Sequence, residues 1–165
     1  MARLITLSLA LVFTVSCSFS EESEEFGTAM HTIAFEYATI HKAFSADSTT
    51  GVDEAAHRIE EVARTIDVST IEGEKAGLLE ALPARLAGSA AKLVQARDLA
   101  GKREVFRELS ASMVEWAVAT RPVGLHIASC PMAKARWLQR EDKVLNPYYG
   151  SSMLHCGTIG SPPTR

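Results

Sequence analysis

Soft-ligand side chains gather in the last third of this 165-residue chain. Two thiols, two thioethers and one imidazole lie within a single short segment, at Cys130, Met132, Met153, His155 and Cys156. Thiolates and thioethers favour soft ions, and thioethers favour Cu(I) or Ag(I) over Zn(II). If the two ends of the segment fold together, they assemble a metal site. In that site the two cysteines would be the main ligands and the methionines auxiliary ones.

A disulfide between Cys130 and Cys156 is the alternative use of the same thiols. Exported proteins usually join such a pair of cysteines. The bond would close a loop of about 26 residues and stabilise the fold by roughly 3–4 kcal/mol in the chain-entropy model. The segment would then be a structural or interaction module, with Trp137, Tyr148 and Tyr149 packed on the helices or on a partner. Both alternatives stay open, and redox state could interconvert them.

Signatures of catalysis, nucleotide binding and haem binding are missing from the sequence. His155 precedes Cys156, but adjacency in sequence does not create a catalytic Cys–His pair. There is no Cys-x-x-Cys, metalloprotease or phosphate-loop motif, and no haem-attachment motif. His31, His41 and His57 fall on separate helical turns and form no ligand set. We therefore expect a protein that is not an enzyme and that carries neither haem nor nucleotide.

The N-terminal residues predict export and a lipid anchor. Residues 4–15 form an apolar run that is too short to span a bilayer but suits a signal peptide. The stretch that ends at Cys17 resembles a bacterial lipobox, although Thr14 replaces the usual leucine. We expect residues 1–16 to be a lipoprotein signal peptide and Cys17 to be lipidated. Ser18 then favours a periplasmic lipoprotein in the outer membrane, whereas an ordinary cleaved signal is the alternative.

Composition predicts one globular domain behind an acidic tether. Apolar residues make up 47% of the chain, which is enough for a single core. The net charge is −3 and the basic residues are scattered, so we expect no nucleic-acid binding. Residues 17–27 are acidic and lack periodicity, which is typical of a solvated tether.

Residues 28–121 carry the hydrophobic period of amphipathic helices. Four such segments are expected, over residues 28–45, 50–66, 74–97 and 98–121. Because Pro83 lies inside the third, that helix is either kinked or made of two pieces that meet at Leu82. Short connections then predict an all-α fold, an antiparallel four-helix bundle. Residues 122–165 are expected to form an irregular Cys/Met segment packed on the bundle, in which 123–128 could be a short strand.

The terminal segment also carries the residues of a family resemblance. In that segment they are Cys130-Pro131-Met132-Ala133, Trp137-Leu138-Gln139, Asn146-Pro147-Tyr148-Tyr149-Gly150, Met153-Leu154 and Cys156-Gly157. Further matches lie upstream, in the fourth helix, at Asp98, Arg103, Phe106, Leu109 and Ser110. In these residues the chain, from about Thr28 to Gly157, resembles an uncharacterised bacterial exported domain. That domain occurs alone or appended to periplasmic adaptors of copper/silver efflux pumps.

The resemblance implies a role in heavy-metal homeostasis or efflux. It implies a metal-efflux adaptor or a metallochaperone as partner, and its metal positions match Cys130, Met132, Met153 and Cys156. His155 matches no position of the family motif. Arg136 stands where the family has a glycine-like position.

Overall fold

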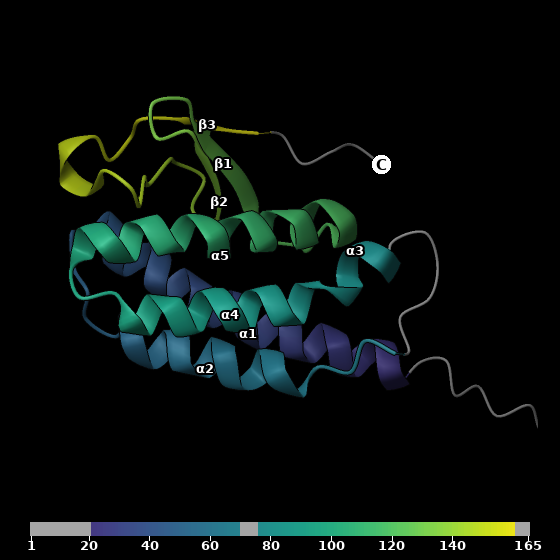
Figure 1. The fold of residues 1–165 in the computed structure, drawn as a ribbon. Coiled ribbons are helices and arrows are strands. Elements are labelled where there is room, and N and C mark those ends of the chain that lie inside the picture. The colour runs from purple at the N-terminus through teal and green to yellow at the C-terminus, as the bar shows by residue number, and fades with distance from the viewer. Residues whose placement is uncertain (1–20, 70–75, 161–165) are drawn as a thin grey trace, which may run out of the picture.

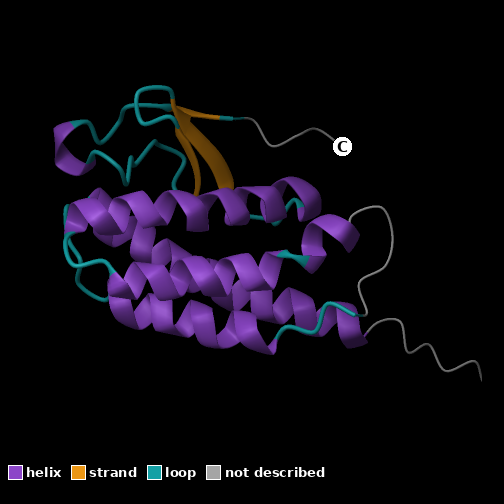
Figure 2. Ribbon diagram, in the orientation of Figure 1, coloured by secondary structure: helices purple, strands orange, loops and turns teal. Residues whose placement is uncertain are grey.

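The computed structural model describes residues 21–69 and 76–160 and is mostly helical (Figure 1). Its helices are α1 (Glu21–Ser45), α2 (Val52–Thr65), the short α3 (Ala76–Glu80), α4 (Leu82–Gln95) and α5 (Leu99–Thr120). Its strands are β1 (His126–Cys130), β2 (Ala135–Gln139) and β3 (Thr158–Ile159), and Gly150–Ser152 form a 3-10 turn. The four long helices lie side by side, and the strands cover α5 on one side of them (Figure 2).

The fold prediction is confirmed in part: the protein is mostly helical, but it is not purely all-α, because the C-terminal segment forms a three-stranded antiparallel sheet. The strand order is β2-β1-β3, and Cys130 pairs with Ala135 at the end of the β1–β2 hairpin. The suggested strand at 123–128 is shifted, since β1 spans His126–Cys130. The local sequence of this segment shows only weak strand alternation. The sheet forms because pairing between distant segments satisfies the hydrogen-bonding groups of their backbones.

Local sequence chemistry explains where the helices begin. The carboxylate of Asp98 accepts the N–H of Gly101 at 2.8 Å and caps α5. Two helical pieces, α3 and α4, meet at Leu82, as one of the two alternatives predicted. Pro83 is tolerated there because a proline in the first turn of a helix removes no intrahelical hydrogen bond.

The acidic residues placed in the predicted tether partly belong to a helix. Helix α1 begins at Glu21, upstream of the predicted start at Thr28. Acidic residues such as Glu24 and Glu25 interact favourably with the positive end of a helix dipole, which explains why helix α1 includes them.

A row of aromatic rings joins the helices to the sheet. The ring of Phe106 stacks on Tyr37 at 5.0 Å between centroids and meets the edge of Phe44 at 5.2 Å. On its other side Phe106 lies 6.0 Å from Tyr148, which in turn meets Trp137 of β2 at 5.9 Å. The sheet therefore shares one hydrophobic core with the bundle.

None of the helices within residues 21–69 and 76–160 is both long enough and apolar enough to cross a membrane. The predicted signal peptide, Cys17 and Ser18 lie outside the described residues.

Candidate functional site

Strand pairing brings the two distant cysteines together. Strand β1 pairs antiparallel with β3, and Ser129 stands opposite Thr158. Cys130, the next residue of β1, therefore lies beside the residues that precede β3, and its Sγ is 3.1 Å from Sγ of Cys156. Gly157 permits this approach, because at its φ of 138° a Cβ would lie 2.5 Å from the carbonyl oxygen of Ser129.

The spacing of the two sulfur atoms suits either a covalent bond or a bridging ion. Both cysteines are free thiols in the structure, and 3.1 Å exceeds the S–S bond length of about 2.05 Å. Two thiolates on one tetrahedral ion at metal–sulfur distances of about 2.3 Å would be about 3.8 Å apart. Either state therefore requires a change in the sulfur–sulfur distance of about 1 Å or less.

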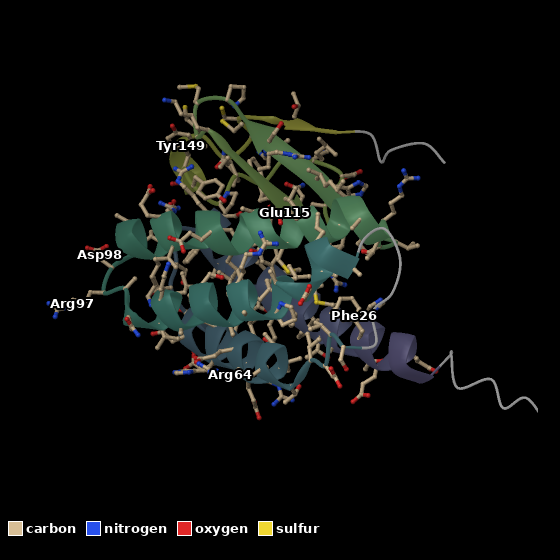
Figure 3. The ribbon with its side chains drawn as sticks, turned by 45° about the vertical axis from the view of Figure 1, so that its right-hand side comes forward. Phe26, Arg64, Arg97, Asp98, Glu115 and Tyr149 are labelled. Atoms are coloured by element: carbon tan, nitrogen blue, oxygen red, sulfur yellow. The ribbon has the colours of Figure 1, made fainter. Side chains whose placement is uncertain are left out.

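Met132 contributes the third sulfur atom of the cluster. Its Sδ lies 4.0 Å from Sγ of Cys156, at the turn between β1 and β2. The hydroxyl of Tyr149 donates to the carbonyl oxygen of Met132 at 3.2 Å and ties this turn to the following loop. Since Met132 is 63% exposed, the cluster reaches the protein surface. Figure 3 shows Tyr149 on the sheet side of the molecule. We call Cys130, Cys156 and Met132 the sulfur cluster.

Met153 and His155 are not brought into the sulfur cluster. The two sulfur–sulfur contacts within the described residues join Cys130, Cys156 and Met132 only. His155 is exposed, and its Nδ1–H donates to the carbonyl oxygen of Val144 at 2.8 Å. This hydrogen bond leaves the lone pair on Nε2 of His155.

A metal ion bound here would need a third ligand besides the two cysteines, either a methionine or a group from outside the cluster. In the part of the chain that the structure describes, no three His, Cys, Asp or Glu side chains are grouped so that they could hold a metal ion. The sulfur cluster supplies two thiols and one thioether, which is a donor set that suits a monovalent soft ion of low coordination number.

The two thiols differ in acidity. Burial raises the pKa of the Cys130 thiol, but hydrogen bonds from the Cys156 thiol and from the backbone N–H of Ala133 outweigh it, so the net pKa is lowered. The pKa of Cys156 is raised because its S–H donates to Cys130, and burial adds to this effect. Cys130 is therefore the first of the pair to become a thiolate.

Asn146 organises the loop that carries Cys156. Its side-chain amide donates to the carbonyl oxygen of Cys156 at 2.8 Å, and its Oδ1 accepts the N–H groups of Tyr148 and Tyr149. Its own backbone N–H donates to Leu154 O at 2.7 Å. The Asn side chain is fully buried, so these bonds satisfy a polar group that would otherwise destabilise the core.

A second anchor joins this loop to the helices. The guanidinium of Arg103 donates to the carbonyl oxygens of Pro147 and Phe44 and to Oδ1 of Asp47, each at 2.7 Å. The other carboxylate oxygen of Asp47 accepts the N–H of Ser151 at 2.9 Å. Hydrogen bonds from the side chain of Ser151, from Arg103 and from the backbone N–H of Ser151 lower the pKa of Asp47 to about 2. Arg103 and Asp47 thus hold the loop before Cys156 against the end of α1.

The sequence pattern did not reveal these supporting roles. Asn146 entered only through the family resemblance, and nothing in the sequence indicated that its side chain is buried. Arg103 matched the family resemblance without an assigned function. Burial of polar side chains depends on what packs over them, and no local periodicity encodes that.

Fold and site together define a small helical domain whose appended three-stranded sheet carries a surface sulfur cluster. The chain belongs to the family described as protein of unknown function (DUF3347), whose model matches residues 33–123. That match covers the helices and ends before β1, so it does not include the sulfur cluster. Neither a curated protein nor a solved structure matches the chain.

Proposed function

We propose that this protein binds a soft monovalent metal ion, Cu(I) or Ag(I), at the sulfur cluster, and that it has no catalytic role. The observation that carries the proposal is the convergence of three sulfur atoms, from the end of β1, the turn that follows it and the loop before β3. Cys130 and Cys156 lie 3.1 Å apart, and Met132 lies 4.0 Å from Cys156. Met153 and His155 belong to the wider segment but not to this ligand set.

The acidity and the exposure of the cluster support metal transfer as well as binding. Cys130 ionises first, and the metal would displace the proton of Cys156, since thiolates and not thiols are the metal ligands. Met132 stands at the solvent edge of the site, where a weakly held thioether can leave as an incoming ligand arrives. A partner could therefore take the ion without unfolding the sheet.

The setting that we propose comes from the sequence resemblance and from the N-terminal residues. In this proposal Cys17 carries lipid, and the mature protein stands in the periplasm at the outer membrane. A copper/silver efflux adaptor or a metallochaperone would be the partner that gives or receives the ion.

An anaerobic Cu(I) titration of the reduced mature protein against a competing chromophoric chelator tests the site. We expect one equivalent to bind. Cys130→Ser and Cys156→Ser should each weaken binding by at least about 100-fold, because a thiolate ligand is lost. Met132→Leu should weaken it about 10-fold, since an auxiliary thioether is lost.

Met153→Leu is the matched control, because it removes the methionine that lies outside the cluster. It should bind Cu(I) as tightly as the parent protein. Absence of stoichiometric binding would refute the proposal, and so would equal affinities of Met132→Leu and Met153→Leu.

The same sulfur–sulfur distance favours a second candidate function, a structural or interaction module stapled by a Cys130–Cys156 disulfide. Intact mass of the non-reduced protein should then be two hydrogens below that of the reduced protein. The oxidised form should be more stable to unfolding by roughly 3 kcal/mol. An oxidised protein that is refractory to mild reductant would favour the staple over the metal site.

A further inference from the structure

A groove lies between α5 and the β1–β2 hairpin. Its volume is about 490 Å³. This size falls within the range of about 300–1,000 Å³ that is usual for small-molecule sites. Figure 3 shows Glu115 on α5, the helix that forms one wall.

The groove has an apolar wall and a basic rim. Ala111 and Val114 of α5 line it on one side, and Pro131 and Ala135 of the hairpin line it on the other. These side chains can contact a hydrophobic body but can bind no polar group. The basic side chains that line the same groove are Arg107, Lys134 and Arg136.

The charges of the groove are unbalanced. Glu115 is the one acidic residue of its lining, and Arg85 already pairs with it. Lys134 and Arg136 have no carboxylate partner within residues 21–69 and 76–160. The chain as a whole has a net charge of −3, whereas this groove carries a local excess of positive charge.

The structure fixes the guanidinium of Arg107 and the backbone positions of Lys134 and Arg136, whose side chains are exposed. The guanidinium of Arg107 lies 4.6 Å from the centre of the Tyr148 ring and donates to the carbonyl oxygen of Ala133. Lys134 holds a left-handed backbone conformation, with φ of 49°, at the end of the hairpin turn. Arg136 belongs to the β-ladder, opposite Ser129. The guanidinium of Arg107 is therefore in place before a ligand arrives, which lowers the entropic cost of binding beside it.

We infer that this groove binds a small organic anion, with its apolar body against α5 and its carboxylate or phosphate head between Lys134 and Arg136. A bare inorganic ion would leave the apolar wall in contact with water, and an uncharged ligand would leave both cations unpaired. The inference does not depend on a metal at the sulfur cluster, although Cys130 also lines the groove.

Fluorescence titration with 8-anilinonaphthalene-1-sulfonate tests the inference, with uncharged N-phenyl-1-naphthylamine as the matched probe. The sulfonate probe should bind saturably at one site and at least about 10-fold more tightly than the neutral one. Displacement by 1-naphthyl phosphate and by 1-naphthoate, but not by 1-naphthol, should follow. Whichever of the two anions displaces the probe at lower concentration identifies the preferred head group.

Lys134→Gln/Arg136→Gln should weaken binding of the sulfonate probe at least about 10-fold. Arg140→Gln, which removes an exposed cation that does not line the groove, should leave binding unchanged. Partial unfolding would increase binding of this probe, and an unchanged far-UV circular dichroism spectrum of the double variant excludes complete unfolding as the cause of a loss. Equal affinity for the two probes, equal displacement by 1-naphthol, or unchanged binding in the double variant would overturn the inference.

Discussion

At the scale of single residues, Gly150 occupies a position that a larger side chain would disturb. Its φ of 54° lies in the left-handed region, and a Cβ there would stand 1.9 Å from Oδ1 of Asp47 and 2.6 Å from a guanidinium nitrogen of Arg103. The Asp47–Arg103 ion pair can therefore form only against a glycine. The close approach of Asp47 and Arg103 therefore explains why the Asn-Pro-Tyr-Tyr-Gly stretch ends in a glycine.

Gly150→Ala should lower the free energy of unfolding by about 1–3 kcal/mol, because it combines backbone strain with displacement of the ion pair. Chemical denaturation measures the change. Gly88→Ala in α4 is the control, since that glycine is exposed in a helix and a Cβ there meets no atom within 4 Å. It should stabilise the protein by about 0.4–1 kcal/mol. Equal effects of the two substitutions would contradict this account.

His41 is a buried histidine with a structural use. Its Nε2–H donates to the carbonyl oxygen of Leu145 at 2.8 Å and so joins α1 to the loop before Asn146. Burial lowers the pKa of His41 below its ordinary value of 6.5, against the smaller opposing effects of that hydrogen bond and of Glu141. The folded protein therefore keeps this imidazole neutral at a pH where the unfolded chain already binds a proton.

The free energy of unfolding should consequently fall as the pH drops below about 6.5, because His41 then binds a proton in the unfolded chain but not in the folded protein. The loss should level off once the pH is below the folded-state pKa. His41→Gln keeps a donor but cannot titrate, so its stability relative to the parent should improve between pH 7 and pH 5. His31→Gln, on the exposed side of α1, should follow the parent at every pH. Urea midpoints across this range measure the effect, and parallel curves for His41→Gln would contradict it.

At the scale of elements, α1 protects the outer edge of the sheet. Strand β2 is an edge strand, and the N–H of Leu138 donates to the hydroxyl of Tyr37 at 3.2 Å. The same hydroxyl lies 2.7 Å from Oγ of Ser110 on α5. One tyrosine thus joins α1, α5 and β2, and it blocks an edge that could otherwise pair with another chain.

Tyr37→Phe should lower the free energy of unfolding by about 1–3 kcal/mol, because it leaves a buried N–H without an acceptor. Tyr149→Phe removes a hydroxyl that bonds to a carbonyl oxygen at the surface, so it should lower stability by less than about 1 kcal/mol. Thermal or urea unfolding compares the two. If Tyr149→Phe were the more damaging change, the edge-protecting role would be wrong.

At the scale of the whole molecule, the helices form a platform and the C-terminal segment carries the sulfur cluster. No three His, Cys, Asp or Glu side chains are grouped for a metal ion within residues 21–69 and 76–160, whereas the C-terminal segment brings two thiols and a thioether together. An anchor at the far end of the chain would leave this surface free for a partner. The anchor itself remains a prediction from the N-terminal sequence.

Cys17→Ser should move the protein from the membrane fraction to the soluble fraction of an expressing bacterium, since it removes the lipidated thiol. Cys130→Ser is the control and should stay in the membrane fraction, because it changes a thiol of the cluster and leaves the lipobox intact. Fractionation followed by immunoblotting reads the result. An unchanged distribution of Cys17→Ser would contradict the anchor.

The sequence alone determined the helical part of this protein. In the first helix five apolar residues recur at helical spacing and are buried, as that spacing leads one to expect: Met30, Ile33, Tyr37, Ile40 and Phe44. The break at Leu82 and the cap at Asp98 were predictable for the same reason. Periodicity, prolines and caps act within a few residues, so the local sequence encodes them.

Only the tertiary structure decided the sheet and the membership of the sulfur cluster. Cys130 and Cys156 meet because β3 pairs with β1, a register set by contacts between residues about 30 positions apart. The same pairing brings Met132 to Cys156, whereas His155 bonds to Val144 instead, although the sequence offered all five residues as candidate ligands. Strand register and polar burial depend on long-range packing, and the composition of a segment does not contain that information.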